Sequence, residues 1–175
     1  MTLNGSMILA HGSVVALAAS VLIVATLRVN PRLFLKHFPE KVRASQPSLS
    51  GPEKAVGYLF AIPLFAVIAG GPIASALVFT RGAGSPLDPI SLWAHAFLVG
   101  MIFNLVDWLV LDELVLGLGK PRWALPAGVT MEDVTPFDHG RHFADFLKGV
   151  IFCAIVALLA SAVAMGMQWF EGSEV

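Results

Sequence analysis

Hydrophobic residues in this chain gather into four long stretches separated by polar segments. The stretches are Leu3–Leu27, Ala55–Thr80, Ile90–Gly117 and Phe146–Phe170. Each reaches the ~20 residues that an α-helix needs to cross about 30 Å of hydrocarbon. The runs are uninterrupted, whereas the strands of a membrane barrel alternate polar and apolar residues. The pattern predicts an all-α fold, a bundle of four transmembrane helices forming one membrane domain over residues 1–175.

Two longer polar connectors, residues 28–54 and 118–145, join the first span to the second and the third span to the fourth. Within the first connector, Pro31–Phe38 interleaves apolar residues with basic ones. A short helix with this composition lies in the interface between lipid and water. We therefore expect a short interfacial helix directly after the first span.

Three helix starts are marked by a capping residue that is followed by proline. They are Ser50 with Pro52 and Glu53, Asp88 with Pro89, and Thr135 with Pro136. Capping side chains satisfy the free N–H groups of a first helical turn, and proline fits that turn because it has no N–H group. The third signal precedes its apolar stretch by about ten residues, so residues 138–148 are expected to form a helical extension of the fourth span.

Composition and charge narrow the class of protein. Hydrophobic residues make up 57% of the chain and charged residues only 13%, which exceeds what the core of a water-soluble domain of this size requires. Membrane lipid is therefore the expected surrounding. The formal net charge is −1 and no basic stripe with interleaved aromatic residues occurs, so the sequence gives no indication of a nucleic-acid partner.

The positive residues indicate how the bundle is oriented. Of 11 Lys and Arg residues, six lie between the first two spans and four lie in or beside the connector before the fourth span; Arg81 is the exception. Loops rich in Lys and Arg stay in the cytoplasm. We expect an integral protein of a bacterial cytoplasmic membrane, with both connectors inside and both termini outside.

Candidate functional chemistry begins in the third span. Asn104, Asp107 and Asp112 are expected to share one polar face, with Asp107 about 15 Å from the cytoplasmic end. An Asp at the centre of a membrane helix costs about 2.5–3.5 kcal/mol, so its carboxyl should face the bundle and find a partner. Glu113 is expected on the lipid side of the same helix.

The fourth span supplies candidate partners for these carboxyl groups. His142 and Asp145 share a helix face with Asp138, and Lys148 flanks it; Arg141 and Arg28 are further candidate counter-ions. A ligand- or ion-binding site is predicted from Asn104, Asp107, Asp112, His142, Asp145 and Lys148. His142, Asp145 and Asp107 could also hold a divalent metal as cofactor. The other histidines, His11, His37, His95 and His139, are expected to be structural, interfacial or solvated.

One spacing pattern resembles that of a known group of proteins. Asn104-x-x-Asp107-x-x-x-x-Asp112, a connector with Pro126, and His142-Phe143-x-x-Phe146-x-x-Gly149 together resemble a pattern in uncharacterised small bacterial membrane proteins with four helices. The resemblance covers about the third quarter of the chain. It supports grouping these residues and implies no activity.

Three classes of function remain open. The first is a membrane protein that binds, and could transport, a small ligand, ion or proton at a cytoplasm-facing polar site. The second is a metal-dependent or acid–base enzyme acting on a lipid or isoprenoid. The third is an accessory subunit of a membrane complex. Small residues at helical spacing in the fourth span leave intrachain packing, a homo-oligomer and a membrane partner open; these are Ala157, Ala160, Ser161, Ala164 and Gly166.

Overall fold

The computed structural model describes residues 3–83, 87–135 and 137–172, and the side chains of these as far as Phe170. Four long helical segments dominate it: α1 (Gly5–Val29), α3 (Gly51–Arg81), α4 (Pro89–Val106) continued by η2 (Asp107–Leu118), and α5 (His139–Gly172). All four are long and apolar enough to cross a membrane. The described residues contain no strand. The predicted all-α bundle of four candidate spans is confirmed.

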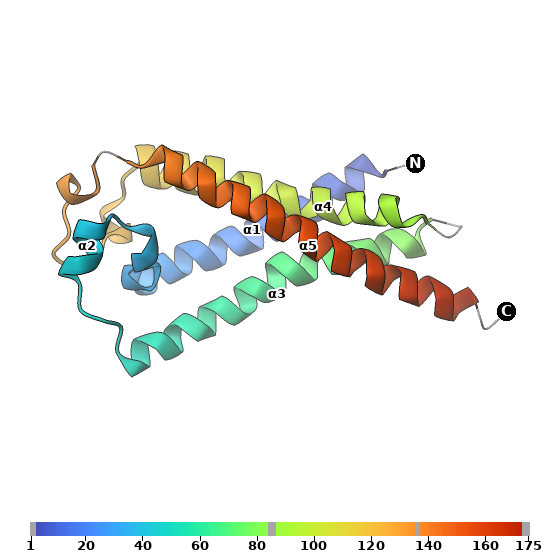
Figure 1. The fold of residues 1–175 in the computed structure, drawn as a ribbon, viewed down its shortest axis with the longest axis horizontal. Helices are drawn as coiled ribbons and strands as arrows, with labels where there is room; N and C mark the ends of the chain where they lie inside the picture. Colours follow the sequence, from blue (N-terminus) through green and yellow to red (C-terminus); the bar gives the residue numbers. More distant parts are fainter. Residues whose placement is uncertain (1–2, 84–86, 136, 173–175) are drawn as a thin grey trace.

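Short helices occupy the two connectors. They are η1 (Pro31–His37), α2 (Glu40–Ser45), η3 (Arg122–Ala124) and η4 (Glu132–Val134). The first of them lies where the short helix after the first span was expected, although it has 3₁₀ geometry. The start of α1 and the end of α5 lie at one end of the bundle, and the connectors gather at the other end (Figure 1).

Two of the predicted helix starts have the expected caps. Ser50 and Glu53 form a capping box, in which the Glu53 N–H donates to Ser50 Oγ (3.4 Å) and the Ser50 N–H donates to Glu53 Oε2 (2.8 Å). Asp88 Oδ1 accepts a hydrogen bond from the Ser91 N–H (2.9 Å). These contacts fix where α3 and α4 begin.

The cap of α5 differs from the prediction. Asp138 Oδ1, rather than the Thr135 side chain, accepts the hydrogen bond from the Arg141 N–H (3.0 Å), while the Thr135 hydroxyl donates to the Met131 carbonyl. Asp138 directly precedes the first helical residue, so its carboxylate reaches the N–H group three residues later. Pro136 lies outside the described residues. The expected extension of the fourth helix ahead of its apolar stretch is confirmed, because α5 begins at His139.

Small residues let the helices approach closely. Ala157, Ala160 and Ala164 of α5 are fully buried, and the Ser161 hydroxyl donates to the Pro89 carbonyl (3.0 Å). The small-residue face of α5 is therefore packed inside the bundle, mainly against α4. The buried small residues of α5 therefore contribute to helix packing within the chain.

The helices diverge toward the connector end. α3 separates from α1 and α5 as it runs back toward its start at Gly51 (Figure 1). An edge-to-face contact between Phe65 of α3 and Phe152 of α5, with ring centroids 6.2 Å apart, joins the two helices farther along. The region between the diverging ends of α3 and α5 is hereafter called the wedge (Figure 1).

Polar contacts hold the connectors together over this end. Lys41 Nζ pairs with Asp133 Oδ1 (2.8 Å), and the Gln46 amide donates to the Ala127 carbonyl (3.2 Å). Hydrogen bonds from Lys41 and from Thr130 hold the pKa of Asp133 well below its usual range. The two connectors, which are far apart in the sequence, thus form one layer.

Candidate functional site

A cavity of about 1170 Å³ lies beneath the connector layer, between the diverging helices. Ligand sites in proteins measure about 300–1,000 Å³, so this space is large enough for an organic molecule. Its walls are mainly apolar and come from α1, η1, α3, α4, η2 and α5. Apolar residues that line it include Leu27, Leu64, Phe65, Ile68, Phe103 and Leu111.

The segment that carries the acidic residues is π-helical. Throughout Asp107–Leu118, backbone bonding follows the i→i+5 pattern, which also ends the segment with a hydrogen bond from the Gly119 N–H to the Leu114 carbonyl (2.9 Å). Such bonding brings residues five apart onto the same side of the helix, so Asp112 lies one turn after Asp107 on that side. At about 100° per residue a regular α-helix would turn Asp112 well away from Asp107. The shared acidic face therefore depends on π geometry, and the α-helical periodicity from which it was predicted is wrong here.

The sequence contains a signal for this geometry that the periodicity analysis missed. Residues 107–111 read Asp-Trp-Leu-Val-Leu, and residues 112–116 read Asp-Glu-Leu-Val-Leu. This five-residue repeat matches the i→i+5 bonding of η2. π-helical segments are rare, often mark functional sites and are usually a single turn long, so one of 12 residues is unusual.

Asp112 and His142 pair with each other in the wall of the cavity. His142 Nδ1 lies 2.8 Å from Asp112 Oδ2, and the side chains are 11% and 22% exposed. Phe137 stacks on the imidazole ring, with centroids 4.4 Å apart and planes 7° from parallel. These contacts fix the ring and leave Nε2 without a hydrogen-bond partner among the described residues. An imidazole held by a carboxylate through Nδ1 is equipped to accept or donate a proton at Nε2.

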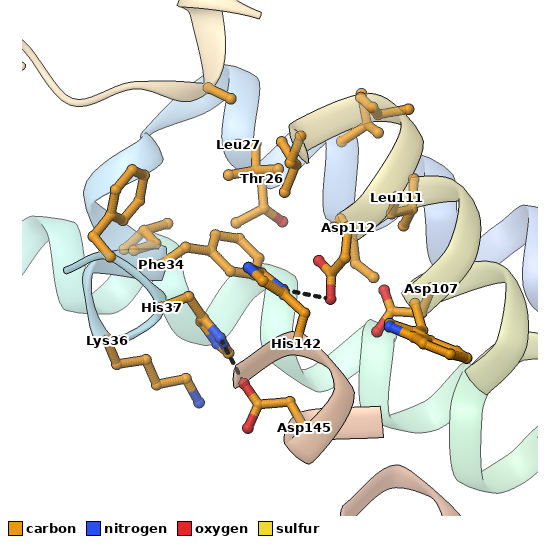
Figure 2. A pocket seen from close by; sticks show the side chains of 18 of the residues that line it. Thr26, Leu27, Phe34, Lys36, His37, Asp107, Leu111, Asp112, His142 and Asp145 are labelled. Atoms are coloured by element: carbon orange, nitrogen blue, oxygen red, sulfur yellow. Dashed lines mark ion pairs between the residues drawn. The ribbon is translucent and has the colours of Figure 1, made fainter. Parts of the chain in front are cut away.

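Asp107 lines the cavity beside this pair (Figure 2). It is within electrostatic reach of Asp112, His142 and Asp145. Its carboxyl group forms no hydrogen bond or ion pair with any other side chain that the structure describes. The neighbouring Trp108 also lines the cavity, and its Nε1–H is buried without a partner. The expected partner for Asp107 is therefore absent from the described part of the chain.

Asp145 lies on the opposite wall, where it has two partners (Figure 2). Lys148 Nζ lies 2.6 Å from Asp145 Oδ1, and His37 Nδ1 lies 3.6 Å from Asp145 Oδ2. Burial lowers the pKa of His37, which favours a neutral ring at pH 7 and a weak contact. Lys148 thus holds Asp145 in place and is not among the residues lining the cavity.

Asn104 is occupied in joining two helices. It is only 6% exposed, and its Nδ2 donates to the Phe146 carbonyl of α5 (3.1 Å). Gly149 lies against it so closely that a Cβ atom at this position would overlap the Asn104 amide. Asn104 borders the cavity, but its amide binds the α5 backbone.

Several charged residues of the helices and connectors have partners outside the acidic cluster. The Arg141 guanidinium donates to the backbone carbonyls of Lys36 and Phe38, and Arg28 stacks over the Trp123 ring at 4.6 Å from its centroid. Glu113 pairs with His139 (2.6 Å) outside the acidic cluster. Among the described residues, no group of three or more His, Cys, Asp and Glu side chains is arranged to hold a metal ion. The set of His142, Asp145 and Asp107 is thus not gathered as metal ligands.

A second polar chain, missed by the sequence analysis, crosses the other half of the bundle. Ser75 Oγ of α3 lies 2.8 Å from His11 Nδ1 of α1 and 2.8 Å from His95 Nε2 of α4. His95 is fully buried and stacks on Phe79, with ring centroids 4.3 Å apart. Because the three residues lie on three helices, only the packing of the bundle reveals the contact.

Comparisons with known proteins add no further assignment. No protein-family model, curated protein or solved structure matches this chain.

Proposed function

We propose that this chain is a membrane protein whose cavity binds a small organic ligand through a positively charged or hydrogen-bond-donating group placed at Asp107. The observation that carries the proposal is the Asp107 carboxyl group, which lines an apolar cavity without a partner among the described residues. Ionisable groups within membrane spans default to functional roles because placing them there is costly. A ligand cation would supply the missing partner.

The size and polarity of the cavity favour an organic cation over a bare ion or a proton. A volume of about 1170 Å³ far exceeds what an ion requires, and the walls around Leu64, Phe65 and Phe103 offer no oxygen ligands. An ammonium group with an apolar body would place its charge beside Asp107 and its carbon atoms against these walls. Charge-assisted hydrogen bonds between ammonium and carboxylate are among the strongest in proteins.

Binding of decylammonium tests this proposal. The protein is placed in phosphatidylcholine nanodiscs, and equilibrium binding is compared between the wild type and a variant that lacks the Asp107 charge. Decanol, which has the same chain and no charge, serves as the competitor. Equal binding of both compounds, or equal affinity in both proteins, would contradict the proposal.

An acid–base membrane enzyme is the second candidate function. It is favoured by the His142–Asp112 contact of 2.8 Å, which leaves the imidazole Nε2 unpartnered within the described residues. General bases in enzymes are commonly histidines oriented in this way. If a bound ligand is recovered chemically altered, the enzyme class is favoured; if it is recovered intact, the binding class is favoured.

We also propose that the connector end lies in the cytoplasm and that both termini lie outside. The proposal is supported by the placement of ten of the 11 Lys and Arg residues in or beside the two connectors at that end. A bacterial cytoplasmic membrane fits the same distribution.

Single cysteines can test this orientation. In a Cys153→Ala background, cysteines at Ser48 and Gly128 should be labelled by an impermeant maleimide only after the membrane is opened, whereas a cysteine at Gly82 should react in intact cells. Ser48 and Gly128 belong to the connector layer, and Gly82 follows α3 at the other end. Labelling of the cysteine at Gly82 only from the cytoplasm would reverse the proposed orientation. Gly84 and Ser173, the other natural choices, lie outside the described residues.

A further inference from the structure

We propose that the ligand of this cavity is an alkyl-chain amine that reaches Asp107 from the lipid bilayer, through the wedge between α3 and α5, and not from water. This inference depends on the proposed function, because it names the class of ligand and its route to the same site. Three observations carry it: the wedge, the basic mouth and the apolar depth of the cavity.

The wedge gives the cavity a side that faces the bilayer. Gly57, Ala61 and Leu64 of α3 line the cavity, and Phe146 of α5 lines it from the other side. The outward face of the same α3 segment is apolar, with Leu59 and Ile62 each 69% exposed. Tyr58 and Phe65 of α3 line the cavity and are also 68% and 58% exposed, so the cavity reaches the outer surface of the bundle here and an alkyl chain can pass between apolar surfaces.

On the connector side of the cavity, hereafter its mouth, the exposed lining residues carry a net positive charge, because three are lysines and one is an aspartate. Lys36, Lys54 and Lys120 are exposed residues that line it on the connector side, and Arg141 lies beside them. Asp138, which also lines this mouth, accepts a hydrogen bond from the Arg141 backbone. Fields from several like charges repel ions of the same sign and slow their approach. A soluble cation coming from the connector side would meet this barrier, whereas an amine coming from the bilayer would bypass it.

The apolar depth explains why the amine should carry a chain. Below Asp107, the cavity continues along Phe103, Ile68 and Phe65, none of which offers a polar side-chain atom. Relative to an amine dissolved in water, each methylene group removed from water contributes about 0.8 kcal/mol in general, so affinity expressed against the free aqueous concentration rises with chain length. A short amine would satisfy Asp107 and leave these walls uncovered.

The experiment compares decylammonium with ethylammonium, using the full chain in phosphatidylcholine nanodiscs and tryptophan fluorescence as the readout, since Trp108 and Trp123 line the cavity. On the scale of free aqueous concentration, decylammonium should bind saturably and at least ~100-fold more tightly than ethylammonium, as several methylene groups removed from water would require. Added salt should leave its association rate unchanged, because entry from lipid avoids the basic mouth.

Two variants of α3 test the route. Ala61→Trp places a bulky ring where α3 lines the cavity, and should slow decylammonium association by at least about tenfold. Ala66→Trp is the matched control, because Ala66 is exposed on the same helix and does not line the cavity. If Ala61→Trp fails to fold, the dependence of affinity on chain length and of the association rate on salt still tests the same inference.

The outcomes separate this inference from the proposed function. If ethylammonium binds as tightly as decylammonium, or if the two tryptophan variants behave alike, the site takes soluble cations; the bilayer route then fails and the proposed function stands. If neither ammonium ion binds in a way that depends on Asp107, the proposed function fails as well. Selective, salt-independent binding of decylammonium that is slowed only by Ala61→Trp supports both.

Discussion

Replacing Asp107 by asparagine is expected to weaken decylammonium binding at least ~30-fold while leaving the helical content unchanged. The amide preserves the shape of the side chain and removes its charge. Truncating one partner of a buried, hydrogen-bonded charge pair costs about 2–5 kcal/mol, and 2 kcal/mol corresponds to roughly a 30-fold change in affinity. The variant should also be at least as stable as the wild type without ligand, because an unpartnered carboxyl group is costly to bury.

A matched substitution at the other end of the bundle controls for the change of charge. Asp88 caps α4 through the Ser91 N–H, and asparagine caps helices about as well as aspartate. Asp88→Asn therefore makes the same chemical change away from the cavity and should leave the affinity within about twofold. If Asp107→Asn and Asp88→Asn bind decylammonium equally, the ligand does not use Asp107.

Replacing Gly149 by alanine is expected to be the most damaging small substitution near the site. Its Cβ atom would overlap the Asn104 amide, so either Asn104 must rotate away from the Phe146 carbonyl or α4 and α5 must separate. Overpacking costs about 1–3 kcal/mol, and a buried amide left without its partner costs about as much again. We expect a lower midpoint of thermal unfolding in detergent and a disturbed cavity.

Two further variants show whether this clash is the cause. Gly166→Ala lies on the same helix with nothing within 4 Å of the added Cβ, so it should be neutral or slightly stabilising. Adding Asn104→Ala to Gly149→Ala removes the overlapping amide and should recover part of the lost stability. If the double variant is no more stable than Gly149→Ala alone, the cost lies elsewhere.

The architecture could be predicted from the sequence because it depends on local and additive signals. Apolar runs longer than a bilayer is thick indicate spans, and the caps at Ser50 and Asp88 depend on residues within one turn of each other. The grouping of Asp107 with Asp112, His142 and Asp145 followed from their place near one end of adjacent spans. Neither kind of inference requires the side-chain geometry.

The pairings could not be predicted, because they depend on how the helices rotate and approach. The π geometry of η2 changes the direction in which the Asp112 side chain points, and the position of α5 then places His142 beside it. Asp145 pairs with Lys148 and His37 instead. A periodicity of 3.6 residues contains no information about such a change. Contacts between three helices, such as the one at Ser75, have no sequence signal at all.

The carboxyl group of Asp107 lines an apolar cavity, and the proposed function requires that it be available to a ligand. Reaction with a hydrophobic carbodiimide tests it most directly, because this reagent reaches carboxyl groups in apolar surroundings and modifies their protonated form. Modified sites are mapped by mass spectrometry with and without decylammonium. We predict modification at Asp107 that decylammonium prevents and decanol does not. An unreactive Asp107, or one modified equally in the presence of decylammonium, would contradict the proposed role of this carboxyl group.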